Sequence, residues 1–239
     1  TSLKSSTSDF LTDSGYKTSE IGFSLGTKFE QFQNIFLSPE IDFLIEDLET
    51  SDKASSTLKK QEGSYKDLYL NYSINQDLRD KKFRTEDGYT TTFSQEVPIV
   101  SDNAEFANAF QATKYKKLSS TSDMIGKISF FGKTITGLSD DVRISKRLNV
   151  PSSRLRGFER GKVGPVENND YIGGNHISTL NLSATLPTVV EGLDNLDVGV
   201  FFDAANVWGV DYNSSLDDKS KIRSSTGVAL NLMTPIGPL

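Results

Sequence analysis

The chain has 239 residues, a formal net charge of −6, no cysteine and a single histidine, His176. The lack of cysteine excludes disulfide scaffolds, thiolate metal sites and cysteine nucleophiles, and one imidazole excludes any site that needs two. The acidic balance argues against a nucleic-acid partner, because neutralising phosphates requires a surplus of Lys and Arg.

The first clear pattern is an alternation with a period of two residues. Between residues 21 and 29, Ile21, Phe23 and Leu25 fall on one side of an extended chain, and small residues such as Gly22 and Ser24 fall on the other. One face is apolar and the other is small or charged, which indicates a β-strand between two different environments.

The same alternation recurs along the chain. Further runs span residues 35–46, 68–77, 89–97, 180–186, 198–205 and 228–232, with weaker runs at 104–117 and 124–136 and a first strand at 2–10. We therefore expect about ten strands and no convincing helix. No apolar stretch approaches the roughly 20 residues of a membrane-spanning helix, but a membrane-spanning β-strand requires only alternation.

The connections between these runs differ in length. Modest connections lie near residues 29–33, 77–87, 118–123 and 188–195, and longer ones near 46–64, 138–175 and 209–220. Long and short connections mostly alternate, as they do in a barrel with short periplasmic turns and long extracellular loops. The sequence thus predicts an all-β, antiparallel up-and-down transmembrane β-barrel. A soluble β-sandwich is the alternative, and it would bury the apolar face under a second sheet.

Motifs for covalent or metal chemistry receive little support. Residues 22–26 match the G-x-S-x-G spelling of a serine nucleophile, but that motif requires a strand, a sharp turn and a helix, so we expect Ser24 to face the lumen. The acidic clusters at 46–49, at 167–170 and at Asp217 and Asp218 lack the spacing of a calcium loop and are interpreted as solvated loop charge. No cofactor, metal or catalytic residue is expected.

The longest loop, about 138–175, contains an unusual tip. Leu155 and Phe158 flank Arg156 and Gly157, which suggests that the tip is tucked into the protein. If the loop folds into the lumen, Arg156 requires a carboxylate, because an unpaired buried guanidinium is costly. Asp203, on the inward face of a later strand, is the candidate partner.

Several ordered motifs resemble the bacterial surface antigen (BamA) family of outer-membrane assembly factors. They are the tip from Leu155 to Phe158, the Gly173-Gly174-Asn175 sequence, the strand from Phe201 to Trp208, the segment from Arg223 to Leu239, and Asp77, Arg79 and Asp80 followed by Asp87-Gly88. The resemblance is clear from about residue 76 to 239. It implies that Arg156, Gly157 and Phe158 lie in the lumen against Asp203, supported by residues 173–175.

The resemblance also implies a larger protein. The family has a sixteen-stranded barrel with upstream periplasmic POTRA domains, so residues 1–239 are expected to be a partial barrel without its terminal strands. Two positions depart from the family pattern. Ser183 stands where many relatives have Glu, which leaves Arg156 one acidic partner, and Thr85 stands where the mid-barrel turn usually has Pro.

The function that the resemblance implies is the folding and insertion of β-barrel proteins into the bacterial outer membrane, without enzymatic chemistry. The implied partners are the outer-membrane lipid bilayer, unfolded outer-membrane protein clients and accessory lipoproteins. A protein-export barrel of the same superfamily, either TamA-like or of two-partner secretion, is the nearest alternative. A passive porin is more distant, because its loop would only constrict the pore and would lack the Arg-Gly-Phe tip.

Overall fold

The computed structural model describes residues 1–11, 15–186, 196–217, 221–234, 237 and 238. The expected connection at 188–195, Asp218 and part of the Arg223 to Leu239 motif lie outside these residues. The long strands are β1 (Ser2–Phe10), β2 (Tyr16–Gly26), β4 (Ile35–Thr50), β5 (Gly63–Asp77), β6 (Gly88–Ser101), β7 (Glu105–Lys117), β8 (Ile125–Gly137), β11 (His176–Thr185), β12 (Leu196–Trp208) and β13 (Arg223–Thr234). The expectation of about ten strands is therefore confirmed.

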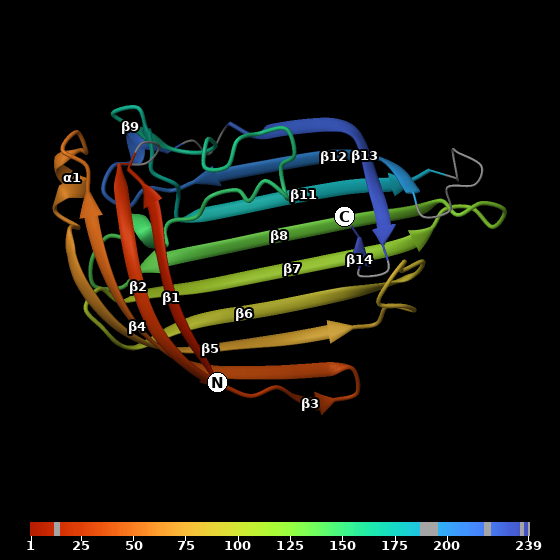
Figure 1. Ribbon diagram of the computed structural model, residues 1–239, viewed down its shortest axis with the longest axis horizontal. Coiled ribbons are helices and arrows are strands. Elements are labelled where there is room, and N and C mark those ends of the chain that lie inside the picture. The colour runs from red at the N-terminus through yellow and green to blue at the C-terminus, as the bar shows by residue number, and fades with distance from the viewer. Residues whose placement is uncertain (12–14, 187–195, 218–220, 235–236, 239) are drawn as a thin grey trace.

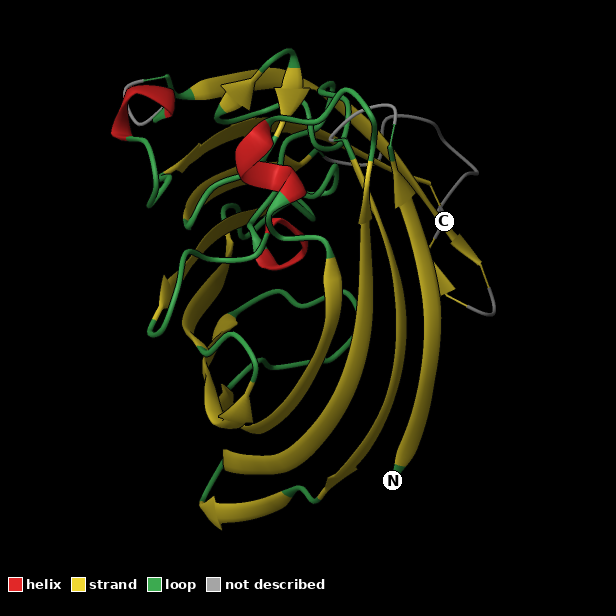
Figure 2. Cartoon of the chain, turned by 90° about the vertical axis from the view of Figure 1, so that its left-hand side faces the viewer, coloured by secondary structure: helices red, strands yellow, loops and turns green. Residues whose placement is uncertain are grey.

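Each long strand pairs antiparallel with the next one along the chain, so the sheet is an up-and-down meander (Figure 1). Two short strands extend it, since β3 (Phe29–Phe32) pairs with β4 and β14 (Gly237–Pro238) pairs with β13. Within the described residues, no pairing joins β1 to β13 or β14. Figure 2 shows the sheet curving strongly around loop segments on its concave side.

The outer face of the sheet is apolar and uncovered. Ile21, Phe23 and Leu25 of β2 expose 64%, 43% and 55% of their surface. The residues that alternate with them, such as Ser24, point inward and are buried. The same outward exposure holds for Ile41, Phe43, Leu70, Ile74, Phe110, Ile128, Phe130, Leu182, Val200, Phe202, Val228 and Leu230. Apolar side chains at these positions suit contact with acyl chains. Within the described residues, no second sheet covers this face, as a soluble sandwich would require.

The connections separate the two ends of the sheet. Connection 51–62, connection 138–175 and the described part of connection 209–222 lie at one end, here the loop end, and connections 27–34, 78–87 and 118–124 lie at the other, the turn end. The predicted sorting by length holds for these three longest connections, but the short connections after β1 and after β6 also join strands at the loop end. Among the described residues, no helix is long and apolar enough to cross a bilayer.

The long loop between β8 and β11 fills the concave side instead of extending into solvent. It contains η1 (Ile144–Lys146) and the hairpin of β9 (Val166–Glu167) and β10 (Asp170–Tyr171). Three apolar clusters hold it, the first together with α1 (Ser56–Lys59) and the loop that contains η2 (Ser214–Leu216). The buried members of the first cluster are Tyr16, Leu48, Ala54, Leu58, Ile144, Ile172 and Val210. These contacts bring the polar groups of the loop against the lumen wall.

Candidate functional site

The tip of the long loop lies on the inner face of β12. The Arg156 side chain donates two hydrogen bonds to Asp203, from Nε at 2.7 Å and from Nη2 at 2.8 Å, and its backbone N–H donates a third at 3.1 Å. Asp203 is fully buried, whereas Arg156 retains 34% exposure of its side chain. The structure thus brings together the two residues that sequence reasoning placed side by side.

Two neutral neighbours complete this contact. Asn181 of β11 faces Asp203 across the strand pair, and its Nδ2 donates to Asp203 Oδ1 at 2.8 Å and to the Arg154 carbonyl at 2.7 Å. The Arg156 guanidinium also lies over the Phe201 ring, 3.6 Å from its centroid. A guanidinium can bind a carboxylate at its edge and an aromatic ring on its face at the same time.

The residues that follow Arg156 explain the direction of the tip. Gly157 has φ +82°, a backbone conformation that favours glycine, although a Cβ there would meet no atom within 4 Å. Phe158 then packs against an apolar cluster between the loop and the wall. Its buried members are Val150, Leu155, Val163, Ile177, Ala205 and Val207. Glycine therefore supplies the turn, and the flanking apolar residues anchor it.

The Gly173-Gly174-Asn175 sequence connects the loop to β11. Gly173 has φ +67°, and a Cβ on Gly174 would lie 2.6 Å from the backbone oxygen of Trp208. Asn175 donates its N–H to Gly209 O and accepts from Ile135 N–H, both at 2.8 Å, which continues the ladder into β12 and β8. These residues allow the loop to pass close to the wall.

Ser183 lies farther along β11, toward the turn end. It faces the lumen beside Lys127 of β8 and Phe201 of β12, and it lines a cavity of about 1230 Å³ between the loop tip and the connection 78–87. From β11, Asn181 joins the Arg156 contact, and the described hydrogen bonds of Arg156 do not include Ser183. Thr85 is also buried beside this cavity, where its hydroxyl donates to Lys81 O at 2.7 Å.

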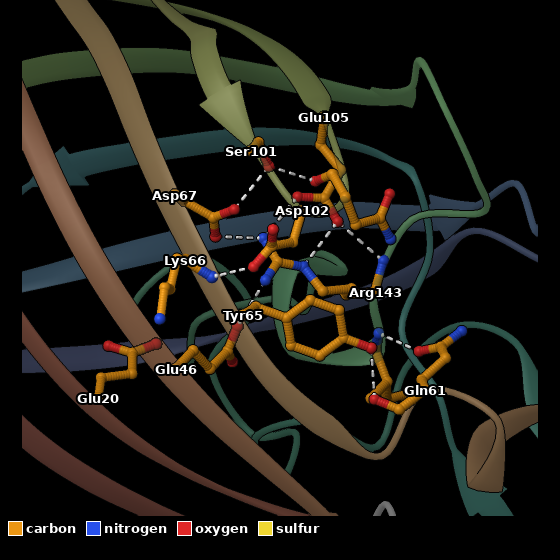
Figure 3. A network of polar contacts seen from close by, with 12 residues as sticks. Glu20, Glu46, Gln61, Tyr65, Lys66, Asp67, Ser101, Asp102, Glu105 and Arg143 are labelled. Atoms are coloured by element: carbon orange, nitrogen blue, oxygen red, sulfur yellow. Dashed lines mark hydrogen bonds and ion pairs between the residues drawn. The ribbon is translucent and has the colours of Figure 1, made fainter.

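A second arginine of the loop, Arg143, makes an anchor that sequence reasoning missed (Figure 3). Its side chain is fully buried and pairs with Asp67 of β5 at 2.6 Å, with Glu105 of β7 at 3.0 Å and with Glu46 of β4 at 3.3 Å. Its backbone N–H also donates to Glu105 at 3.0 Å, and its guanidinium lies 4.5 Å from the Tyr65 ring centroid. One residue of the loop thus connects three strands of the wall.

The electrostatics of Arg143 follow from this arrangement. Burial alone would lower its pKa, but the hydrogen bonds and charges of Glu105 and Asp67 outweigh that effect and raise the pKa above its ordinary value. Arg143 is therefore cationic at every relevant pH. The prediction that Glu46 carries solvated loop charge is wrong. Glu46 lies within β4, where it is a buried partner of this cation.

A similar correction applies to Glu167 in the second acidic cluster. It accepts hydrogen bonds from Tyr212 at 2.7 Å and from Ser55 at 2.9 Å. Burial raises the pKa of Tyr212, and the hydrogen bond to Glu167 raises it further. This carboxylate connects the loop hairpin to the segments that contain α1 and η2.

Two further loop arginines, Arg147 and Arg154, make similar contacts. Arg147 pairs with Asp211 at 3.1 Å and lies over the Tyr212 ring, 4.9 Å from its centroid. Arg154 donates to Gln111 at 2.8 Å and lies 4.0 Å from the Phe131 ring centroid. Together with Arg143 and Arg156, each of these four arginines lies over an aromatic ring of a different wall or loop segment.

The arrangement binds and positions a loop and has no feature of a reaction centre. Ser24, the candidate nucleophile of the G-x-S-x-G spelling, lies within β2 and hydrogen-bonds to Ser2 at 2.6 Å. In the part of the chain that the structure describes, no group of three or more His, Asp or Glu side chains could hold a metal ion.

An antiparallel meander with an apolar outer face and a loop folded into its polar interior defines an outer-membrane β-barrel. The family model of the Omp85 superfamily domain matches residues 1–239. The chain belongs to the Omp85 superfamily, whose members are outer-membrane barrels that assemble or transport proteins and are not enzymes. The expected family and location are thereby confirmed.

A solved structure supports the same fold. The chain is similar to the crystal structure of BamA from Haemophilus ducreyi lacking POTRA domains 1–3, with a TM-score of 0.82 and 20% sequence identity. The match covers 93% of this chain and 50% of that one, so the chain spans about half the length of the solved structure. At this level of identity, the likeness concerns the fold alone.

Proposed function

We propose that the whole protein folds β-barrel proteins and inserts them into the outer membrane. The observation that carries the proposal is the loop tip, whose Arg156 is held by the buried Asp203 inside the barrel wall. A loop that only narrows a pore has no need of a fully buried partner acid, so this contact argues against a passive porin. The fold match to a BamA barrel supports the same proposal.

The mechanism we infer is mechanical, without a covalent step. The loop joins β4, β5 and β7 through Arg143 and β12 through Arg156, so it braces opposite parts of the wall from inside. A braced wall keeps its shape while strands of an incoming client pair elsewhere on the barrel. Backbone pairing then satisfies the hydrogen-bonding groups of the client as it enters the bilayer.

The proposal extends to parts outside this chain. The matched BamA structure is about twice as long as the matched region, and its description names POTRA domains. We infer that the whole protein has further barrel strands, amounting to sixteen, and upstream POTRA domains that receive unfolded clients. Accessory lipoproteins are the partners expected on the periplasmic side, and their co-purification with the full-length protein tests that part.

A reconstitution experiment tests the function directly. The full-length protein is placed in liposomes, and an unfolded outer-membrane β-barrel protein is added from outside. The proposal predicts faster appearance of the folded client, detected by its heat-modifiable electrophoretic mobility, than in empty liposomes. Delivery of a soluble passenger into the vesicle interior without client insertion would instead identify a TamA-like or two-partner secretion export barrel.

A further inference from the structure

A row of inward-facing residues crosses the lumen wall on the turn-end side of the loop tip. Tyr115 of β7, Lys127 of β8, Ser183 of β11 and Phe201 of β12 are successive partners in the sheet. Neighbouring strands lie about 4.8 Å apart, so the backbones of Lys127 and Phe201 are about 10 Å apart. Because Arg156 lies over the Phe201 ring, Ser183 occupies the register position between Lys127 and the residue that Arg156 covers.

These cations face the cavity described above, and its acidic residues are already paired. The four carboxylates that line it and their basic partners are Asp77 with Arg79, Glu86 with Lys81 and Lys117, Asp123 with Lys117, and Asp197 with Arg84. The lining carboxylates therefore leave no free negative charge for the cations around Ser183.

Two of the cavity's cations have only neutral neighbours among the described contacts. Lys127 lies over the Tyr115 ring, 5.7 Å from its centroid, and Arg154 donates to the amide oxygen of Gln111. Arg156 forms an ion pair with Asp203, and that carboxylate also accepts a hydrogen bond from Asn181. At the end of the cavity near the loop tip, three cations are thus accompanied by one carboxylate, which is paired with Arg156, although the chain as a whole carries a net charge of −6.

Like charges that face one cavity repel each other, and an anion placed between them reduces the repulsion. Charge-assisted hydrogen bonds from ammonium, guanidinium and hydroxyl groups are the usual contacts of a bound carboxylate or phosphate. The Ser183 hydroxyl adds a donor without adding a charge. The lumen wall therefore presents donors and positive charge where an acidic group is missing.

We propose that the space between Lys127, Ser183 and Arg156 is a binding site for an oxyanion, either free phosphate or the carboxylate of a polypeptide in the lumen. The inference does not depend on the proposed insertion of clients. Arg154 adds to the positive potential of the site, and the cavity of about 1230 Å³ gives the ligand access from the turn end.

The test uses the full-length protein folded in detergent micelles and has two arms. Calorimetric titration with inorganic phosphate measures the binding of a free anion. Fluorescence anisotropy of a labelled aspartate-rich peptide, compared with that of its asparagine counterpart, measures the binding of polypeptide carboxylates. The site predicts binding in at least one arm, and the arm that gives binding identifies the source of the anion.

Three variants locate that binding. Lys127→Gln should weaken it about tenfold, the effect of losing roughly one charge-assisted hydrogen bond. Ser183→Glu should abolish it by placing a carboxylate between the cations, and Lys127→Arg should retain it. Lys133→Gln is the matched control, since Lys133 also faces the lumen but is paired with Glu96 at 2.6 Å.

Folding of each variant is verified by its heat-modifiable mobility, so loss of binding is read only in folded protein. Client insertion in liposomes is measured separately, and its failure leaves the anion site untouched. Absence of binding in both arms, equal binding of the two peptides without phosphate binding, or unchanged binding in folded Lys127→Gln would overturn the proposal.

Discussion

Asp203 and Arg156 form an unequal pair. The carboxylate of Asp203 is fully buried and accepts both side-chain and backbone donors of Arg156, whereas about a third of the arginine side chain remains exposed. The acid is thus the fixed partner, set in β12, and the arginine is the part that a moving loop could withdraw. Removal of the arginine leaves a buried charge with Asn181 as its remaining side-chain donor.

Arg156→Ala should therefore reduce barrel stability by about 2 kcal/mol, because a buried carboxylate loses its charged partner while part of the arginine was already in water. The measurement is the urea midpoint of the heat-modifiable form of the full-length protein. Asp203→Asn combined with Arg156→Ala should recover part of the loss. A single variant as stable as the wild type would contradict the role of the pair.

Arg143→Gln should be the more severe substitution. It leaves Glu46, Asp67 and Glu105 together without a cation in a fully buried position, and breaking a buried ion pair from one side typically costs about 3 to 5 kcal/mol. The same urea titration measures the loss. The matched control is Arg160→Gln, since Arg160 is exposed in the same loop and should change little.

Charge neutralisation separates electrostatics from packing at this anchor. If Arg143→Gln is destabilising because three acids remain unpaired, adding Glu46→Gln and Glu105→Gln should restore much of the lost stability. A triple variant that is less stable than Arg143→Gln alone would show that packing of the arginine, and not its charge, holds the loop.

Two glycines of the loop should respond differently to alanine. In Gly157→Ala the new Cβ meets no neighbouring atom, but alanine must adopt φ of +82°. This variant should lose about 1 kcal/mol of barrel stability. Gly174→Ala forces a Cβ to 2.6 Å from the Trp208 backbone oxygen, which cannot move without disturbing β12. Gly174→Ala should lose about 3 kcal/mol of barrel stability, measured as a lower yield of heat-modifiable protein. The reverse order would contradict the close approach of loop and strand.

Leu182→Arg tests the lipid-facing surface. Leu182 points outward from β11, and a charge near the bilayer midplane should cost about 2 to 4 kcal/mol. Thr185→Arg on the same strand points into the cavity and serves as the control, because it meets water. Equal stability of the two variants in liposomes would be inconsistent with the assigned faces.

The alternation of residue types was sufficient to predict the strands and their faces, because strand geometry makes every second side chain share one environment. The expected outward positions of Ile21 and Phe23 and the inward position of Ser24 are all observed. The contact between Arg156 and Asp203 could also be predicted, since both the apolar flanks of the tip and the inward phase of β12 were visible in the sequence.

The anchor at Arg143 could not be predicted in the same way. Its partners come from β4, β5 and β7, and only the pairing register of three separate hairpins brings them to one place. In the sequence, Glu46 lies at the end of the run 35–46 and in an acidic cluster interpreted as solvated loop charge, whereas β4 continues to Thr50. A usable signal was present, since Glu46 and Leu48 continue the inward phase of the preceding residues.

The account depends on one property of the sheet, which is that alternate residues meet lipid and an enclosed lumen. Residues 1–239 contain no cysteine, so single-cysteine variants at positions 180–184 of β11 can each carry a fluorescent label once any cysteine elsewhere in the full-length protein is replaced. Quenching by brominated lipids in liposomes should be strong at positions 180, 182 and 184 and weak at 181 and 183. Uniform quenching along β11, or quenching with the opposite phase, would contradict the account.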